Sequence, residues 1–266
     1  MQMLKSVFAA AAAFAALTLS AAEVINLASS DVVRNAWGTP LKFEENQITT
    51  KGRAFIVMKK TIDIDHAKKY SFKVTAVGNK VKPTAIYIGF DPLNENGVSI
   101  PAIQLQGLQY TFTQLARDAK KGDTVIYVKN GQAWVRGGSV VFVKDAKADN
   151  SDVPNSKVVG GNIVSVKKEG AEWAVTFKNA LKEDLAAGTA VREHINGGFY
   201  YCAVKTVPKD GEIVLSGTVS GLPKYLQQYN GKNWPIGAKK ASFIILADWT
   251  NTKTPVILKD ATFTIE

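Results

Sequence analysis

The sequence predicts an all-β protein in which one β domain is inserted into another. Helical periodicity is nearly absent from the chain beyond residue 22. Runs of β-branched and aromatic residues recur instead, and they are bounded by Gly, Asn, Asp and Pro, as strands commonly are. The sequence pattern changes at Gly122 to short strands that are each followed by a turn, and it changes back after residue 195. This indicates two β units of different architecture.

Residues 1–22 are predicted to form a signal peptide. Lys5 precedes an apolar run over residues 7–19, and the small residues SAAE follow, which together have the three parts of an export signal. The apolar run is too short for a membrane-spanning helix, which needs about 20 residues. We therefore expect no transmembrane segment and a secreted protein, periplasmic or extracellular, whose mature chain begins at Ala22 or Glu23.

The net charge of +10 is spread evenly along the chain. Residues 23–110 contain 11 basic and 8 acidic side chains, residues 111–195 contain 13 and 10, and residues 196–266 contain 8 and 5, so each segment is +3. A nucleic-acid-binding surface concentrates its basic residues on one face or segment, so we expect no nucleic-acid partner. Cys202 is the only cysteine; it excludes an intramolecular disulfide and is expected to be a buried thiol in an apolar strand.

The first β unit contains strands at residues 54–64, 69–77 and 84–90. The first is apolar and then alternates. In the second, Tyr70 and Phe72 alternate with polar residues, which is typical of a half-buried strand. The third strand ends at the polar turn DPLNENG.

Residues 111–195 consist of short strands, each followed by a turn, and they are expected to form a small β-barrel-like domain. The pieces KGDTVIYV, GNIVSVKKEGAEWAVTF and NALKEDLAAGTAV follow one another in this segment. In that order they resemble a small β module of secreted and phage-associated proteins. The motifs of that module are structural, with glycines at turns and aliphatic residues in the core.

The strand pattern of residues 196–266 is again that of the first unit. The apolar strand ASFIILADW, a turn and a last strand that carries Asp260 resemble the closing strands of secreted jelly-roll carbohydrate-binding modules. Residues 41–64 resemble their opening strands. The resemblance covers residues 23–110 and 196–266, and it implies a jelly-roll β-sandwich that binds sugars.

The two outer segments are expected to form one sandwich. A jelly roll needs about eight strands, whereas residues 23–110 offer roughly five and residues 196–266 roughly three to four. Neither segment completes a sandwich alone. Since insertions are tolerated where the flanking chain ends lie close together, residues 111–195 are predicted to be an insert between two neighbouring strands of a discontinuous sandwich.

Catalytic motifs are absent from the sequence. His66 and His194 lie in different units, and His194 is expected to be a boundary histidine that bonds to the backbone. The loops FDPLNENG and DNSDVPN gather oxygen ligands that suit calcium, but polar turns use the same residues. We expect no cofactor, and a structural calcium ion is the one metal that the resemblance to carbohydrate-binding modules allows.

Aromatic residues in loop sequence are the candidate ligand-binding residues. Sugar-binding faces need exposed rings beside groups that bond to hydroxyls. The loop PKYLQQYNGKNWP supplies several aromatic and amide side chains, and two further tryptophans lie in Gly- and Asn-containing turns. The candidates are Trp234, Tyr225, Tyr229, Asn233, Trp37 and Trp249. At each tryptophan, a ring that covers the edge of the sandwich is the alternative.

Three functions follow from these observations, in order of preference. The first is a non-catalytic protein that binds a polysaccharide or glycan. The second is a structural or adhesive protein of the cell envelope, and the third is a polysaccharide-degrading enzyme whose acids come from distant positions.

Overall fold

The computed structural model describes residues 22–135, 137–142, 147–148, 151–154, 157–158, 162–195, 197–223 and 231–266. The predicted signal peptide, Tyr225 and Tyr229 lie outside these residues. The predicted all-β fold is confirmed: the described residues form strands in antiparallel sheets, with one short helix among them, α1 (Ala102–Leu105). None of the helical residues that the structure describes forms a helix long and apolar enough to cross a membrane.

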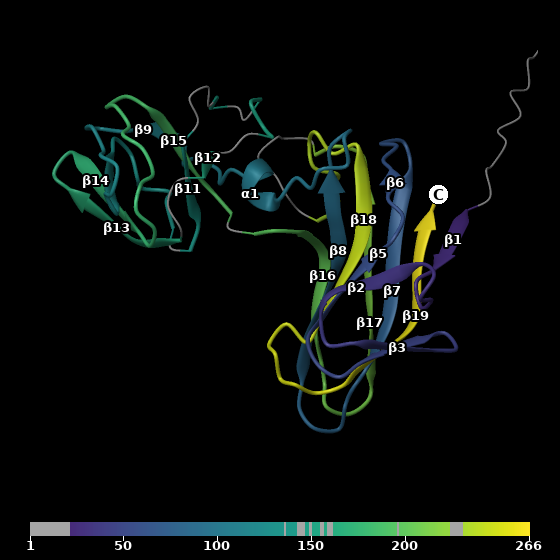
Figure 1. Ribbon diagram of the computed structural model, residues 1–266. Helices are drawn as coiled ribbons and strands as arrows, with labels where there is room; N and C mark the ends of the chain where they lie inside the picture. Colours follow the sequence, from purple (N-terminus) through teal and green to yellow (C-terminus); the bar gives the residue numbers. More distant parts are fainter. Residues whose placement is uncertain are drawn as a thin grey trace, which may run out of the picture.

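Two antiparallel sheets face one another in the main body of the molecule (Figure 1). The first contains, in order, β17 (Glu212–Ser220), β7 (Lys69–Val77), β19 (Val256–Ile265), β4 (Gln47–Thr50) and β3 (Leu41–Glu44), and β1 (Glu23–Asn26) pairs with β19. The second contains, in order, β16 (Tyr200–Val207), β8 (Thr84–Leu93), β18 (Lys240–Ala247), β5 (Ala54–Met58) and β2 (Val33–Gly38), and β6 (Ile62–Asp63) pairs with β18.

The order of the longer strands is that of a jelly roll. If β4, β5, β7, β8, β16, β17, β18 and β19 are numbered one to eight along the chain, the first sheet has the order 6-3-8-1 and the second 5-4-7-2. Strands from both outer segments therefore alternate in each sheet, as two interleaved Greek keys require. Residues N-terminal and C-terminal to the predicted insert thus form one sandwich.

The space between the sheets is filled by aromatic and aliphatic side chains. The predicted alternation in β7 is confirmed, because Tyr70, Phe72 and Val74 are buried. Phe72 stacks on Phe243 of the facing sheet and on Phe263 of the neighbouring strand β19, with ring centroids 4.8 and 5.0 Å apart. Such ring contacts add to the hydrophobic free energy of the core.

The second sheet is also covered on its outer face. Phe55, Ile244 and Leu246 point away from the main core, yet all three are buried in a second cluster. The ring of Phe199, which precedes β16, lies 4.7 Å from that of Phe55. This cover explains why β18 is apolar on both faces instead of alternating.

Residues between β8 and β16 form the second β unit, which Figure 1 shows beside the upper part of the sandwich. Its strands are β9 (Thr113–Gln114), β10 (Val125–Val128), β11 (Ser139–Phe142), β12 (Lys157–Val158), β13 (Ile163–Glu169), β14 (Glu172–Phe177) and β15 (Ala190–His194). They form two sheets, β10-β14-β13 and β12-β11-β15-β9. A separate hydrophobic cluster, which includes Leu115, Val128 and Phe177, lies within this unit.

The described strands of the insert form two sheets that do not close into one continuous barrel, so the barrel-like form expected for the insert stays a prediction. Among the described residues, short contacts join the edges of the two sheets. Leu115 bridges to Val128 on one side, and the amide of Gly137 donates to the carbonyl of Ile163 on the other. The short strands β9 and β12 leave too few backbone pairs for a continuous ladder.

The two chain segments that connect the insert to the sandwich lie side by side. The amide of Ile103 donates to Gly197, that of Ile195 to Gln106 and that of Leu108 to Glu193, at 3.2, 2.9 and 2.8 Å. Since β8 and β16 are neighbours in one sheet, the insert occupies the position of a hairpin loop. The division into two domains that fold separately stays a prediction.

Replacement of residues 109–192 by Asn-Gly should close the connecting segments into a tight hairpin and leave a folded sandwich. We expect lower stability, because Val153 of the insert belongs to the buried core cluster of the sandwich. Circular dichroism and limited proteolysis check this prediction. A product without a cooperative unfolding transition would contradict it.

Candidate functional site

Trp234 lies in the core, so the expectation that it forms an exposed platform is wrong. It is fully buried, and its ring lies 5.0 Å from Tyr70 and 4.6 Å from Phe90, centroid to centroid. The backbone amide of Trp234 donates to Gly221, which draws the end of this loop back onto β17. The neighbouring Asn233 is partly exposed and donates from Nδ2 to the carbonyl of Ser220 at 2.9 Å.

Trp37 and Trp249, in contrast, are exposed and share one neighbour. Trp37 is at the end of β2 and 41% exposed, and Trp249 follows β18 and is 44% exposed. The guanidinium carbon of Arg53 lies 5.4 Å from the centroid of Trp37 and 3.9 Å from that of Trp249. The structure therefore brings two of the sequence-predicted residues onto one patch, hereafter the Trp37–Arg53–Trp249 patch.

The turn between β2 and β3 holds Trp37 and Arg53 in place. Gly38 has a φ of +99°, and a Cβ there would lie 2.2 Å from the carbonyl oxygen of Arg53, so the close approach requires glycine. Thr39 donates its amide to the same carbonyl at 2.8 Å. Trp37 also stacks on Phe55, with ring centroids 5.3 Å apart.

The loop after β18 holds Trp249 through a buried carboxylate. Asp248 is fully buried and accepts hydrogen bonds from the side chains of Thr84 and Thr252 and from the amides of Thr252 and Lys253. Burial alone would raise its pKa, but these hydrogen bonds lower it below the ordinary value. The Trp249 amide donates to Ala85, which fastens the loop to the start of β8.

An open pocket of about 520 Å³ adjoins the patch. Its side chains come from three turns at the same end of the sandwich, those after β2, β4 and β18; they are Trp37, Thr39, Lys51, Arg53, Asn251 and Lys253. Sequence reasoning missed Arg53 and Lys51. The feature of the sequence that could have identified them is that both are basic and flank Gly52, in the turn before the strand at residues 54–58.

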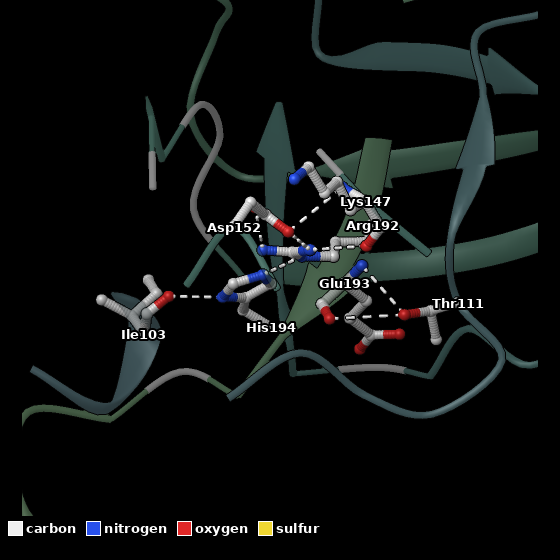
Figure 2. A network of polar contacts seen from close by, with 7 residues as sticks. All are labelled: Ile103, Thr111, Lys147, Asp152, Arg192, Glu193 and His194. Carbon is white, nitrogen blue, oxygen red and sulfur yellow. Dashed lines mark hydrogen bonds and ion pairs between the residues drawn. The ribbon is translucent and has the colours of Figure 1, made fainter. Parts of the chain in front are cut away.

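A buried polar network marks the junction between the insert and the sandwich (Figure 2). Arg192 on β15 pairs with Asp152 through two bonds of 2.8 Å, and both side chains are buried. Burial alone would raise the pKa of Asp152, but bonds from Arg192 and from the Lys147 amide lower it. The carboxylate is therefore ionised.

His194 completes the network as a neutral ring. Arg192 donates from Nε to Nε2 of His194 at 2.6 Å, so Nδ1 carries the proton and donates to the carbonyl of Ile103. Burial, together with the positive charge of Arg192, lowers the pKa of His194 to about 4. The expectation of a boundary histidine bonded to the backbone is confirmed.

Glu193 points to the other face of β15. It is fully buried, and its Oε2 accepts a hydrogen bond from the Val135 amide at 2.9 Å, while Oε1 has no partner among the described residues. Burial raises the pKa of Glu193 to about 7, against the opposing effect of the Val135 amide. Arg192, Glu193 and His194 are buried, so the network offers no exposed surface for a substrate. Its bond from His194 to Ile103 connects the insert to the segment that follows β8.

The candidate calcium loops use their side chains in internal contacts. Asn94 accepts hydrogen bonds from the amides of Asn96 and Val98, and Asp91 accepts one from Ser99. In the other loop, Asp152 pairs with Arg192, and Asp149, Asn150 and Asn155 lie outside the described residues. Across the described ranges, no three His, Cys, Asp or Glu side chains form a metal-binding group. The calcium ion stays a prediction.

Comparison of the chain with protein-family models, with curated proteins and with solved structures found no match.

Trp234→Ala should lower the free energy of unfolding by about 3–5 kcal/mol, because it leaves a cavity between Tyr70 and Phe90. The half-exposed Trp249 is the matched control, and Trp249→Ala should cost well under half as much. Urea denaturation of both variants measures the difference. Equal losses would contradict the core position of Trp234.

Glu193→Gln should reduce the dependence of stability on pH. The pKa of Glu193 is about 7 in the folded protein and near 4.5 in the unfolded chain. Between these values the folded state holds a proton that the unfolded state has released, so its contribution to stability falls as pH rises. Glutamine mimics the protonated acid and removes this loss.

The free energy of unfolding of Glu193→Gln, minus that of the wild type, should therefore be larger at pH 8 than at pH 5, by on the order of 2–3 kcal/mol. The variant thus gains stability relative to the wild type as the pH rises. Urea denaturation at both pH values measures it. His194 acts in the opposite direction between its pKa of about 4 and the ordinary 6.5, but this effect is common to both proteins and cancels. A difference that does not change with pH would refute the assignment.

Proposed function

We propose that the protein is a non-catalytic glycan-binding protein and that the Trp37–Arg53–Trp249 patch is its binding surface. The observation that carries the proposal is the convergence of two exposed tryptophan rings beside an open pocket with polar side chains. The apolar C–H face of a pyranose packs on such rings, and neighbouring polar groups bond to its hydroxyls.

The way in which the patch is built supports this proposal. Both rings are fixed before any ligand arrives: Trp37 stacks on Phe55, and the Trp249 loop is fastened by the bonds of Asp248. Side chains that are already ordered lose little conformational entropy on binding. Thr39 and Asn251 supply groups that donate and accept hydrogen bonds at the pocket wall.

The sequence resemblance to secreted jelly-roll carbohydrate-binding modules agrees with this proposal, as does the export signal predicted for residues 1–22. The proposed surface lies at the end of the sandwich where β8 begins, whereas the insert is attached where β8 ends. The insert therefore leaves this end of the sandwich open to a long polymer.

Trp37→Ala and Trp249→Ala should each weaken glycan binding by about 1–3 kcal/mol, because each removes one stacking surface. Binding of the wild type is first located on a glycan array and then measured by calorimetry with the best ligand. Phe112→Ala, which removes a partly exposed ring of the insert, is the matched control and should bind as the wild type does. A wild-type protein that binds no glycan, or tryptophan variants that bind normally, would refute the proposal.

A further inference from the structure

We infer that the Trp37–Arg53–Trp249 patch takes an acidic polysaccharide, one whose sugar rings carry carboxylate or sulfate groups. This inference rests on the proposed function and names the class of glycan. It is based on the positive charge of the patch, which is independent of the stacking of sugar rings on the two tryptophans.

All the charged side chains among the described residues that line the pocket beside the two rings are cationic. Lys51, Arg53 and Lys253 contribute to its wall, and none of the described residues that line it is acidic. The carboxylate of the same loop, Asp248, is fully buried and accepts its hydrogen bonds from the hydroxyls of Thr84 and Thr252 and the amides of Thr252 and Lys253. It forms no salt bridge with the three cations among the described residues, and its single charge offsets only part of theirs. Three like charges around one hollow repel one another, and an anionic ligand relieves that repulsion.

Arg53 has an unused hydrogen-bond donor. Its Nε is shielded from solvent and has no hydrogen-bond partner among the described residues. No salt bridge of the described chain involves this guanidinium. The planar fork of a guanidinium that no carboxylate engages is suited to the paired oxygens of a carboxylate or sulfate.

Arg117 in the insert is a second arginine whose guanidinium packs on an aromatic ring, and it serves as a comparison for Arg53. Its guanidinium carbon lies 3.5 Å from the centroid of Tyr127, an arrangement similar to that of Arg53 over Trp249. Arg117, however, also forms a salt bridge with Glu172. Two arginines thus pack on rings in the same molecule, and the one beside the open pocket is the one that lacks a carboxylate.

Single-stranded nucleic acid also combines rings with negative charge, but the structure favours a polysaccharide. Nucleic-acid grooves stack successive bases along a basic track of several nucleotides. Here the basic residues are spread over the whole chain, with the same net charge in each third, and the patch offers two exposed rings. Nucleic acid is therefore one outcome of the test.

The test measures the affinity of the full-length protein for four probes in low salt: polygalacturonate, dextran sulfate, neutral dextran and oligothymidylate. Affinity electrophoresis and calorimetry give the dissociation constants. We expect binding to polygalacturonate or dextran sulfate at least about tenfold tighter than to dextran. The two acidic polymers distinguish carboxylate from sulfate as the recognised group.

Arg53→Met, which keeps the aliphatic stem and loses the charge, should weaken acidic-polymer binding by about ten- to hundredfold at unchanged melting temperature. Arg53→Lys keeps the charge without the planar fork and should recover part of the affinity. Lys182→Ala, an equal loss of charge on an exposed residue of the insert, is the control and should change affinity by no more than about twofold.

Each contrary result has a distinct meaning. Equal losses in Arg53→Met and Lys182→Ala would show attraction by net charge alone and overturn the inference. Equal affinity for dextran and the acidic polymers, abolished by Trp37→Ala, would overturn it while the proposed function stands. Tighter binding of oligothymidylate than of either acidic polymer would overturn it in favour of nucleic acid. No binding of any polysaccharide, here and on the glycan array, would refute both.

Discussion

The pairing of β8 with β16 is the constraint on which the architecture depends. These strands are neighbours in one sheet, paired from Tyr200 opposite Phe90 to Val207 opposite Thr84 with one register shift between Tyr201 and Ala203, although the whole second β unit lies between them in the chain. Their pairing completes a jelly roll from two segments that are far apart in sequence. It also requires the insert to return its chain to within hydrogen-bond distance of its starting point, which the bonds between residues 103–108 and 193–197 accomplish.

The polar network at this junction follows from that requirement. Where the insert joins the sandwich along a short connection, the last residues of β15 are buried and lose contact with water. Arg192 pairs with Asp152, whereas His194 and Glu193 have no such counter-ion, and burial shifts their pKa values so that both neutral forms are favoured. Arg192 bonds to Asp152 and His194 within the insert, and the ring of His194 donates to the carbonyl of Ile103, so the network reaches the segment that follows β8. Val153 of the adjoining loop, packed in the main core cluster, adds an apolar contact to the same joint.

At the opposite end of β8, cationic and aromatic side chains are exposed instead of buried. There the chain is held by backbone bonds around Gly38 and by the carboxylate of Asp248, and the side chains that remain exposed are rings and cations. The rigidity of this end comes from buried groups, while its exposed groups have few partners of their own. That combination is typical of a surface that binds a ligand. It distinguishes the Trp37–Arg53–Trp249 patch from the buried network at the junction.

The sequence by itself determined the all-β class, the alternation of β7, and the interruption of one β unit by another, because these depend on local strand signals and on the number of strands in each segment. It also identified Trp37 and Trp249 as ring residues in turn sequence. It did not determine that Trp234 is buried, since a Gly- and Asn-rich loop has the same composition whether it extends into solvent or folds back over the core. Nor did it bring together Trp37, Arg53 and Trp249, or Arg192, Asp152 and His194. Those groups come from turns and strands that are distant in the chain, and only the strand order of the folded sandwich decides which of them meet.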